Sequence, residues 1–435
     1  MHKSFRSCPS FSAVAGAVSV AVGLLASGCA VTPAEAPASG AVPAAAKAPV
    51  AASAPVAAAK PAAAPASGAA VAAARPANGA SGPTPPAAAA PPVPGQPPAF
   101  ATVIKDAKKI DGLFTAWVKD ERLWIELRPE DFDKPFFLSP KLSQGIGENM
   151  LFGGLMLSPR LVQFHKVHNV VQLVAVNGQQ IAKAGTPEAR AVASAISPSL
   201  LGSNLVASAP HPDRKSVLVD AGPIFLSDLM ALGAHLQRTY RQGYGLDSRN
   251  SAVVAVRGKP DLLVVETSQH FATASIAVPT PGAPPGAPLP TVPSGVPDAR
   301  SLFLGVHYSL ARLPEVPMAA RAADPRVGHF LTRVDDFSDD LARVPRQRFI
   351  NRWRLEKKDP AAEVSEPVKP ITYWLDRNVP VKYRATITAG VLEWNKAFEK
   401  AGFKDAIVVK QQPDDADWDT LDAGVASVRW MVNRE

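Results

Sequence analysis

The eight histidines of this 435-residue chain are the residues best suited to bind a catalytic metal or to transfer protons near neutral pH. A hydrolytic zinc site typically uses two histidines four residues apart on one helix face, a third ligand, and a glutamate as the base. No two of these histidines stand four apart, and none is followed by Glu. His165 and His168 form a close pair, but they lie in a strand-like run, where residues three apart point to opposite faces. The sequence therefore predicts no catalytic residue, no metal ligand and no bound cofactor in this chain.

A second candidate for metal chemistry is a run of alternating aspartates. Asp415, Asp417 and Asp419 are spaced as at the start of an EF-hand loop, but Thr420 and Ala426 stand where that loop needs Gly and Glu. A solvated turn is favoured over a looser calcium site. No Gly-x-Ser-x-Gly motif occurs, and no Ser/His pair can be argued from spacing.

The N-terminus has the composition of an export signal. A basic start and a short apolar stretch are followed by LASGC at residues 25–29, which resembles a bacterial lipobox. We predict a signal peptide over residues 1–28, lipid attachment at Cys29, and a place in the cell envelope as an outer-membrane lipoprotein. The alternative is an ordinary signal peptide that happens to contain Cys29. Cys8 is the only other cysteine, so no disulfide is expected in the mature chain.

Composition predicts a tether after the signal. Residues 29–100 are rich in Ala and Pro and hold only four charged residues, so they cannot bury enough apolar surface to offset chain entropy. We expect this segment to be disordered.

The formal net charge of the chain is +8, but its basic residues do not form a stripe with interleaved aromatic residues, so nucleic-acid binding is not expected.

The rest of the chain predicts an α+β fold that begins with a β-rich region at residues 101–345. Short apolar runs with period-two alternation recur there, starting with a hairpin at 113–127. We expect a helix at 224–240, a Pro-rich surface loop at 279–297 and a linker at 346–370. Further strands are expected at 135–139, 150–157, 161–167, 170–176, 216–220, 262–266, 271–278 and 301–310.

Residues 371–435 predict a strand, a helix and two more strands. The helix is indicated by one apolar stripe, formed by Ile387, Val391, Trp394 and Phe398, and by Gly402 at its end. Three short strands offer little surface to cover that stripe, so we expect residues 371–435 to be poorly ordered.

Several separated motifs resemble one family in the same order. They are PITYWLD at 370–376, WNKAFEKAGF at 394–403 and DADWD at 415–419, preceded by RAADPRVGHF at 321–330 and FINRWRLEKK at 349–358. Together they are similar to the large exported zinc metallopeptidases of metzincin type in bacteria. The likeness runs from about residue 101 to the end.

The resemblance implies that residues 371–435 open a metzincin-like α/β catalytic domain, which in its complete form hydrolyses peptide or protein substrates with a zinc-activated water. The family's zinc motif, H-E-x-x-H-x-x-G-x-x-H, is expected downstream of Trp430 and is not in this chain. The chain is thus predicted to be the N-terminal portion of such an enzyme and inactive alone. The alternative is a non-catalytic envelope lipoprotein whose β-rich region binds a protein or polymer partner.

Overall fold

Alternation of apolar and polar residues produces the antiparallel sheets that form the framework of the β-rich region. The computed structural model describes residues 96–279 and 288–434, all within one compact unit, Pro86–Glu435. The signal peptide, Cys29, nearly all of the tether and residues 280–287 of the predicted loop at 279–297 lie outside the described residues. Among the described residues, no helix is both long and apolar enough to cross a membrane.

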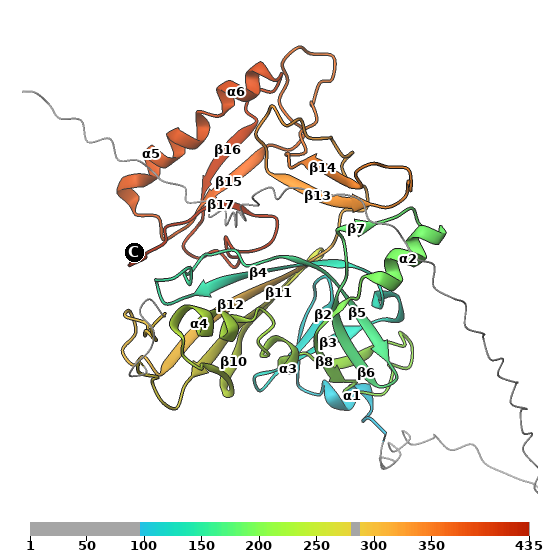
Figure 1. Ribbon diagram of the computed structural model, residues 1–435, viewed down its shortest axis with the longest axis vertical. Helices are drawn as coiled ribbons and strands as arrows, with labels where there is room; N and C mark the ends of the chain where they lie inside the picture. Colours follow the sequence, from blue (N-terminus) through green and yellow to red (C-terminus); the bar gives the residue numbers. More distant parts are fainter. Residues whose placement is uncertain (1–95, 280–287, 435) are drawn as a thin grey trace, which may run out of the picture. The chain divides into compact units, whose positions relative to one another are not determined.

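The largest element is a seven-stranded antiparallel sheet with strand order β10-β11-β12-β4-β5-β6-β8 (Figure 1). Its strands are β4 (Phe136–Gln144), β5 (Arg160–Val167), β6 (Val170–Ala175), β8 (Ser199–Leu205), β10 (Gly245–Lys259), β11 (Leu262–Ala272) and β12 (Ser301–Ala311). The long strands β11 and β12 pair without interruption over their whole length. They give the sheet two extended faces, one apolar and one polar.

A four-stranded sheet with order β1-β2-β3-β9 supplies the other half of the main core. It contains β1 (Lys108–Ile110), β2 (Thr115–Lys119), β3 (Arg122–Leu127) and β9 (Val217–Asp220). The predicted hairpin at 113–127 is confirmed, with Asp120 and Glu121 both at positive φ in its two-residue turn. Phe114, Phe136 and Phe164 pack with ring centroids 5.2–5.3 Å apart and join the two sheets.

The predicted helix at 224–240 is broken in two. α3 (Gly222–Phe225) ends early, and α4 (Leu232–Tyr240) starts after Ala231, which has a φ of 55°. Asp228 sets the second start, because its carboxylate accepts the backbone N–H groups of Leu232 and Gly233 at 2.6 and 2.9 Å. Apolar residues recur at helical spacing across the break, so the sequence pattern predicted one continuous helix and gave no sign of the cap.

The strand predicted at 150–157 is also wrong. These residues form a loop that folds back onto the end of β4, where the Leu142 N–H donates to Leu155 O and the Gly154 N–H to Leu142 O. The loop approaches Gly145 so closely that a Cβ there would lie 2.1 Å from Leu151 O. Glycine at 145 is therefore required by backbone contact.

The remaining small elements complete the β-rich region. They are α1 (Phe100–Val103), η1 (Pro129–Asp131), α2 (Pro187–Ala195) and the three-stranded sheet β14-β13-β7, with β7 (Gln180–Ile181), β13 (Leu331–Asp336) and β14 (Arg346–Ile350). Residues 346–350, predicted as the start of a linker, pair instead with β13. The fold is a β-rich α+β arrangement, which confirms the predicted class.

The C-terminal residues form a separate parallel sheet with order β16-β15-β17. β15 (Ile371–Leu375) leads through α5 (Val381–Leu392) and α6 (Asn395–Lys400) to β16 (Ile407–Gln411), and β17 (Ala426–Val428) follows. Both helices run along the same face of β15 and β16 (Figure 1). Asn395, where α6 begins, is anchored to the sheet because its side-chain amide makes two hydrogen bonds with the backbone of Ile407.

The apolar stripe of α5 and α6 is only partly covered. Val391 and Phe398 are half-buried and line a cavity of about 390 Å³ with Tyr373, while Trp394 remains 64% exposed. The buried residues of this unit belong to neither hydrophobic cluster of the described chain. The C-terminal unit is therefore not held to the β-rich region by a shared apolar core.

Candidate functional site

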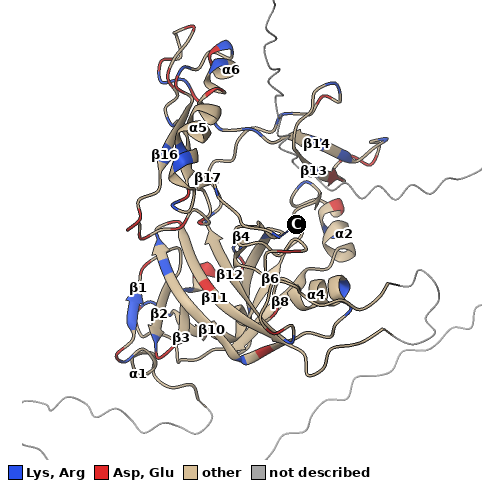
Figure 2. Ribbon diagram, turned by 90° about the vertical axis from the view of Figure 1, so that its left-hand side faces the viewer, with Lys and Arg blue, Asp and Glu red and all other residues tan. Residues whose placement is uncertain are grey.

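The polar face of the seven-stranded sheet carries a row of charged side chains. Arg257 on β10, Glu266 on β11, His307 on β12 and Lys141 on β4 lie on neighbouring strands, with Glu266 opposite His307 and His307 opposite Lys141. Their neighbours Val265, Val306 and Leu142 alternate onto the apolar core face. Figure 2 shows charged residues within these strands. The imidazole of His307 is fully buried.

Asp422, from the loop before β17, inserts its buried carboxylate into this row. Its oxygens lie 3.0 Å from Arg257 Nη2, 3.3 Å from His307 Nε2 and 3.4 Å from Lys259 Nζ. Glu266 sits on the other side, 2.6 Å from Arg257 Nη1 and 3.3 Å from His307 Nδ1. The His307 contacts meet the distance of an ion pair but not hydrogen-bond geometry. They are therefore Coulombic contacts between buried charges.

These contacts shift the protonation equilibria. Burial alone would raise the pKa of Asp422, but His307 and Arg257 outweigh burial and lower that pKa to about 2. Burial likewise disfavours the imidazolium, yet the carboxylates of Asp422 and Glu266 prevail and raise the pKa of His307. At neutral pH Asp422 is ionised and His307 is biased toward its charged form.

Lys141 is the least compensated member of the row. Its ammonium is buried and has no hydrogen-bond partner among the described residues. Burial lowers the pKa of Lys141 to about 8, although the charges of Asp422 and Asp419 partly oppose that shift. The loop that carries both aspartates therefore reduces the cost of keeping Lys141 charged.

The same loop is tied to the C-terminal parallel sheet. Asp376, directly after β15, accepts a hydrogen bond from Thr420 Oγ1 at 2.5 Å and pairs with Arg429 Nη1 at 2.9 Å. On the other side, the Ala423 N–H donates to Ser309 Oγ of β12 at 3.1 Å. These hydrogen bonds and ion pairs join the loop to β15 and to β12, and we call residues 419–423 the docking loop.

The charged row does not have the donor set of a metal site. No group of three His, Cys, Asp or Glu residues in the described ranges, 96–279 and 288–434, is arranged to hold a metal ion. Both ring nitrogens of His307 face carboxylates, and the Arg257 guanidinium bridges those same carboxylates. Guanidinium and imidazolium already neutralise the acidic groups, so the cluster is built for charge compensation.

A second polar group on the same sheet face has the connectivity of a Ser-His-Asp triad. His270 Nε2 lies 2.9 Å from Ser301 Oγ, and its Nδ1 lies 3.1 Å from Asp247 Oδ2. The Ser301 backbone N–H is occupied by Asp298 O at 3.1 Å, so it is not free to stabilise an oxyanion. His270 also stacks beneath Phe303 and is largely buried. We interpret the group as a hydrogen-bonded link across β10, β11 and β12.

The residues weighed from sequence do not assemble into a site. His165 pairs with Asp133 at 2.6 Å, whereas His168 lies at positive φ in the turn between β5 and β6. Asp415 and Asp417 are exposed, and only Asp419 reaches the docking network, through Arg429. Sequence reasoning missed His307, Asp422, Arg257 and Glu266. The sequence signal that was available is the presence of charged residues at the outward-alternating positions of otherwise apolar strands.

Comparison with known proteins gives one family match. Residues 154–358 match the model of a domain of unknown function, DUF5117. No curated protein and no solved structure matches the chain. The matched segment includes Arg257, Glu266 and His307 but not Asp422. It therefore contains the sheet residues that surround the Asp422 carboxylate, but not the docking loop itself.

Replacing Asp422 with Asn should destabilise the folded chain. The change leaves Arg257 and His307 facing one carboxylate in place of two, and breaking a buried ion pair in this way costs about 3 kcal/mol. The free energy of unfolding from urea titration at pH 7 measures the effect. Asp415→Asn, an exposed change in the same segment, should shift it by less than about 0.5 kcal/mol. Equal effects of the two changes would contradict this role of Asp422.

The contribution of the pair should depend on pH at both ends. Since the Asp422 pKa is lowered to about 2, its stabilisation is complete above the unfolded value of about 3.9 and is lost as pH falls toward 2. Since the His307 pKa is raised, its stabilisation is complete below about 6.5 and is lost as pH rises through the folded value. The stability difference between the wild type and His307→Gln, measured from pH 4 to 9, should be largest near pH 5. A difference that grows from pH 6 to pH 9 would refute the assignment.

Proposed function

We propose that this chain is the N-terminal portion of an exported zinc metallopeptidase of metzincin type. The observation that carries the proposal is the parallel β15–helix–β16 crossover with β17 added beside β15. This α/β unit occupies the residues whose motifs resemble the start of that family's catalytic domain. A parallel sheet flanked by helices is a scaffold on which a metal site can be positioned at the strand ends.

The proposed role of the β-rich region is to hold that unit. Parallel sheets are usually covered on both faces, and here the unit shares no apolar cluster with the rest of the described chain. The docking loop supplies the attachment instead, through Asp422 on one side and Asp376 on the other. The β-rich region would thereby fix where the catalytic unit stands.

The zinc of the complete form would supply an activated water for attack on a peptide carbonyl. The described residues do not fit such a site, since their clustered carboxylates and imidazoles neutralise one another. The ligands and the general base are expected in a segment downstream of Trp430. No catalytic step is assigned to a residue of this chain.

A second candidate is a non-catalytic envelope lipoprotein whose β-rich region binds a partner. It is favoured by exposed apolar side chains that flank β13 and β14, namely Phe330, Phe337, Leu341 and Val344. Such side chains are common at protein interfaces. In this case the parallel unit would serve as structure alone.

The reading frame beyond Glu435 separates the two candidates. We predict that it encodes H-E-x-x-H-x-x-G-x-x-H and that the full product binds one zinc per chain and shows chelator-sensitive peptidase activity. Replacing the glutamate of that motif with Gln should abolish activity and retain zinc, which serves as the control. Residues 1–435 alone should carry no stoichiometric zinc by elemental analysis. A stop codon directly after Glu435 with no such motif nearby would refute the peptidase proposal.

We further propose that the chain is anchored to the outer membrane through lipid on Cys29, which lies outside the described residues. Cys29→Ser should abolish incorporation of radiolabelled palmitate and release the protein from the membrane fraction. Cys8→Ser, a matched change within the signal, should retain both. Undiminished labelling of Cys29→Ser would show that Cys29 is not the acylated residue.

A further inference from the structure

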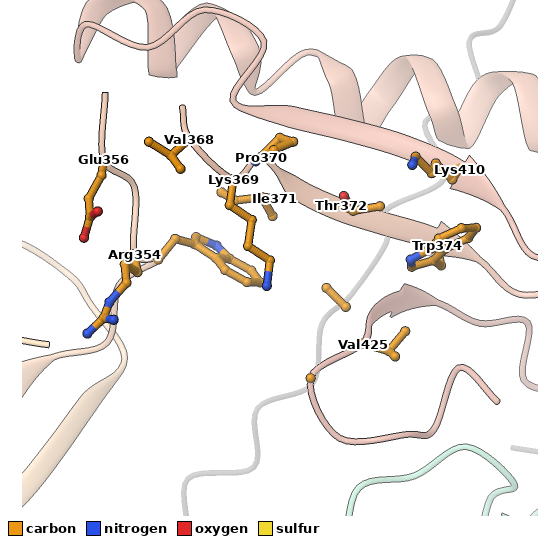
Figure 3. A pocket seen from close by; sticks show the side chains of 13 residues that line it. Arg354, Glu356, Val368, Lys369, Pro370, Ile371, Thr372, Trp374, Lys410 and Val425 are labelled. Atoms are coloured by element: carbon orange, nitrogen blue, oxygen red, sulfur yellow. The ribbon is translucent and has the colours of Figure 1, made fainter. Parts of the chain in front are cut away.

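The face of the parallel sheet turned away from α5 and α6 is hollowed. Tyr373 faces the helices, so by strand alternation Thr372 and Trp374 face the opposite side. There they line a cavity of about 500 Å³ together with the segment around Trp353 and Arg354 (Figure 3). The volume falls within the roughly 300–1,000 Å³ of ordinary ligand sites. We call this the sheet pocket.

The walls of the sheet pocket combine cations with indole rings. Arg354, Lys369 and Lys410 are its basic residues, and Glu356 is its only acidic one. Lys410 and Trp374 lie together at one end in Figure 3, with the ammonium 5.6 Å from the indole centroid. Arg354 and Glu356 lie at the other end, and Lys369 reaches into the space between.

Within the described part of the chain, these cations are not neutralised by ion pairs. No carboxylate of the described residues forms an ion pair with Arg354, Lys369 or Lys410, and the Arg354 guanidinium donates only to the Val316 carbonyl. By contrast, Arg257 and Lys259 on the antiparallel sheet each pair with the Asp422 carboxylate. Uncompensated positive charge in a concave, partly apolar wall concentrates anions.

We propose that the sheet pocket binds an acidic peptide segment, in which one or two carboxylates adjoin an apolar side chain. The carboxylates would pair with Lys369, Lys410 and Arg354, and the apolar side chain would pack on Trp374 and Trp353. The Glu356 carboxylate is able to accept a hydrogen bond from a peptide amide N–H. The site is independent of zinc chemistry, so it goes beyond the proposed peptidase function.

The test uses the full chain and a fluorescein-labelled hexapeptide of alternating Glu and Leu, followed by fluorescence anisotropy. Saturable binding is expected, weakened by added salt. The double variant Lys369→Glu/Lys410→Glu reverses two exposed charges of the pocket and should weaken binding by at least about tenfold. Lys400→Glu/Lys404→Glu makes the same charge change at exposed positions outside the sheet pocket and should stay within about twofold of the wild type.

Three results would overturn the proposal. Equal loss in both double variants would show a general charge effect, and equal binding of the Gln/Leu hexapeptide would show apolar adsorption. Tighter binding of an oligothymidylate of the same charge would assign the pocket to nucleic acid. Because zinc and the downstream motif play no part, failure here leaves the peptidase proposal to its own test.

Discussion

The buried carboxylate of Asp422 is the contact on which the arrangement of the described chain depends. Taking Asp422, Glu266, Arg257 and His307 out of water costs several kcal/mol per ion, and only mutual contact recovers that cost. Without Asp422 the polar face of the sheet would hold Arg257, His307 and Lys141 with Glu266 as the one remaining acid in the row. The buried charges of the sheet therefore need the docking loop for compensation, and the buried carboxylate of the loop needs the sheet.

This constraint explains how a small parallel sheet is held beside a large antiparallel one without a common core. Asp376 and Arg429 fix the docking loop to β15, while Asp422 and the Ala423 amide fix it to β12. The hydrogen bonds from Thr420 to Asp376 and from Ala423 to Ser309 are directional, so they restrict the position of the loop more than apolar contact alone would. One face of the parallel sheet receives α5 and α6, and the other retains the sheet pocket with its unneutralised cations.

The sequence predicted those elements whose formation depends on residues close together in the chain. The hairpin at 113–127 follows from alternation and a two-residue turn, and the stripe from Ile387 to Phe398 predicted the helical segment of α5 and α6. The break before Leu232 was missed because the Asp228 cap depends on side-chain direction. Pairings such as Arg257 with Asp422, 165 residues apart, have no local signal at all. The same holds for Ser301 and His270, which strand register brings together.

A double-mutant cycle on His307→Gln and Asp422→Asn tests the central claim most directly. The free energies of unfolding of the wild type, both single variants and the double variant give the coupling between the two side chains. If the buried pair holds the docking loop to the sheet, the coupling should be about 1–3 kcal/mol at pH 6, with the double variant more stable than the sum of single losses predicts. Losses that add to within about 0.5 kcal/mol would show that the two groups act independently and would contradict the account.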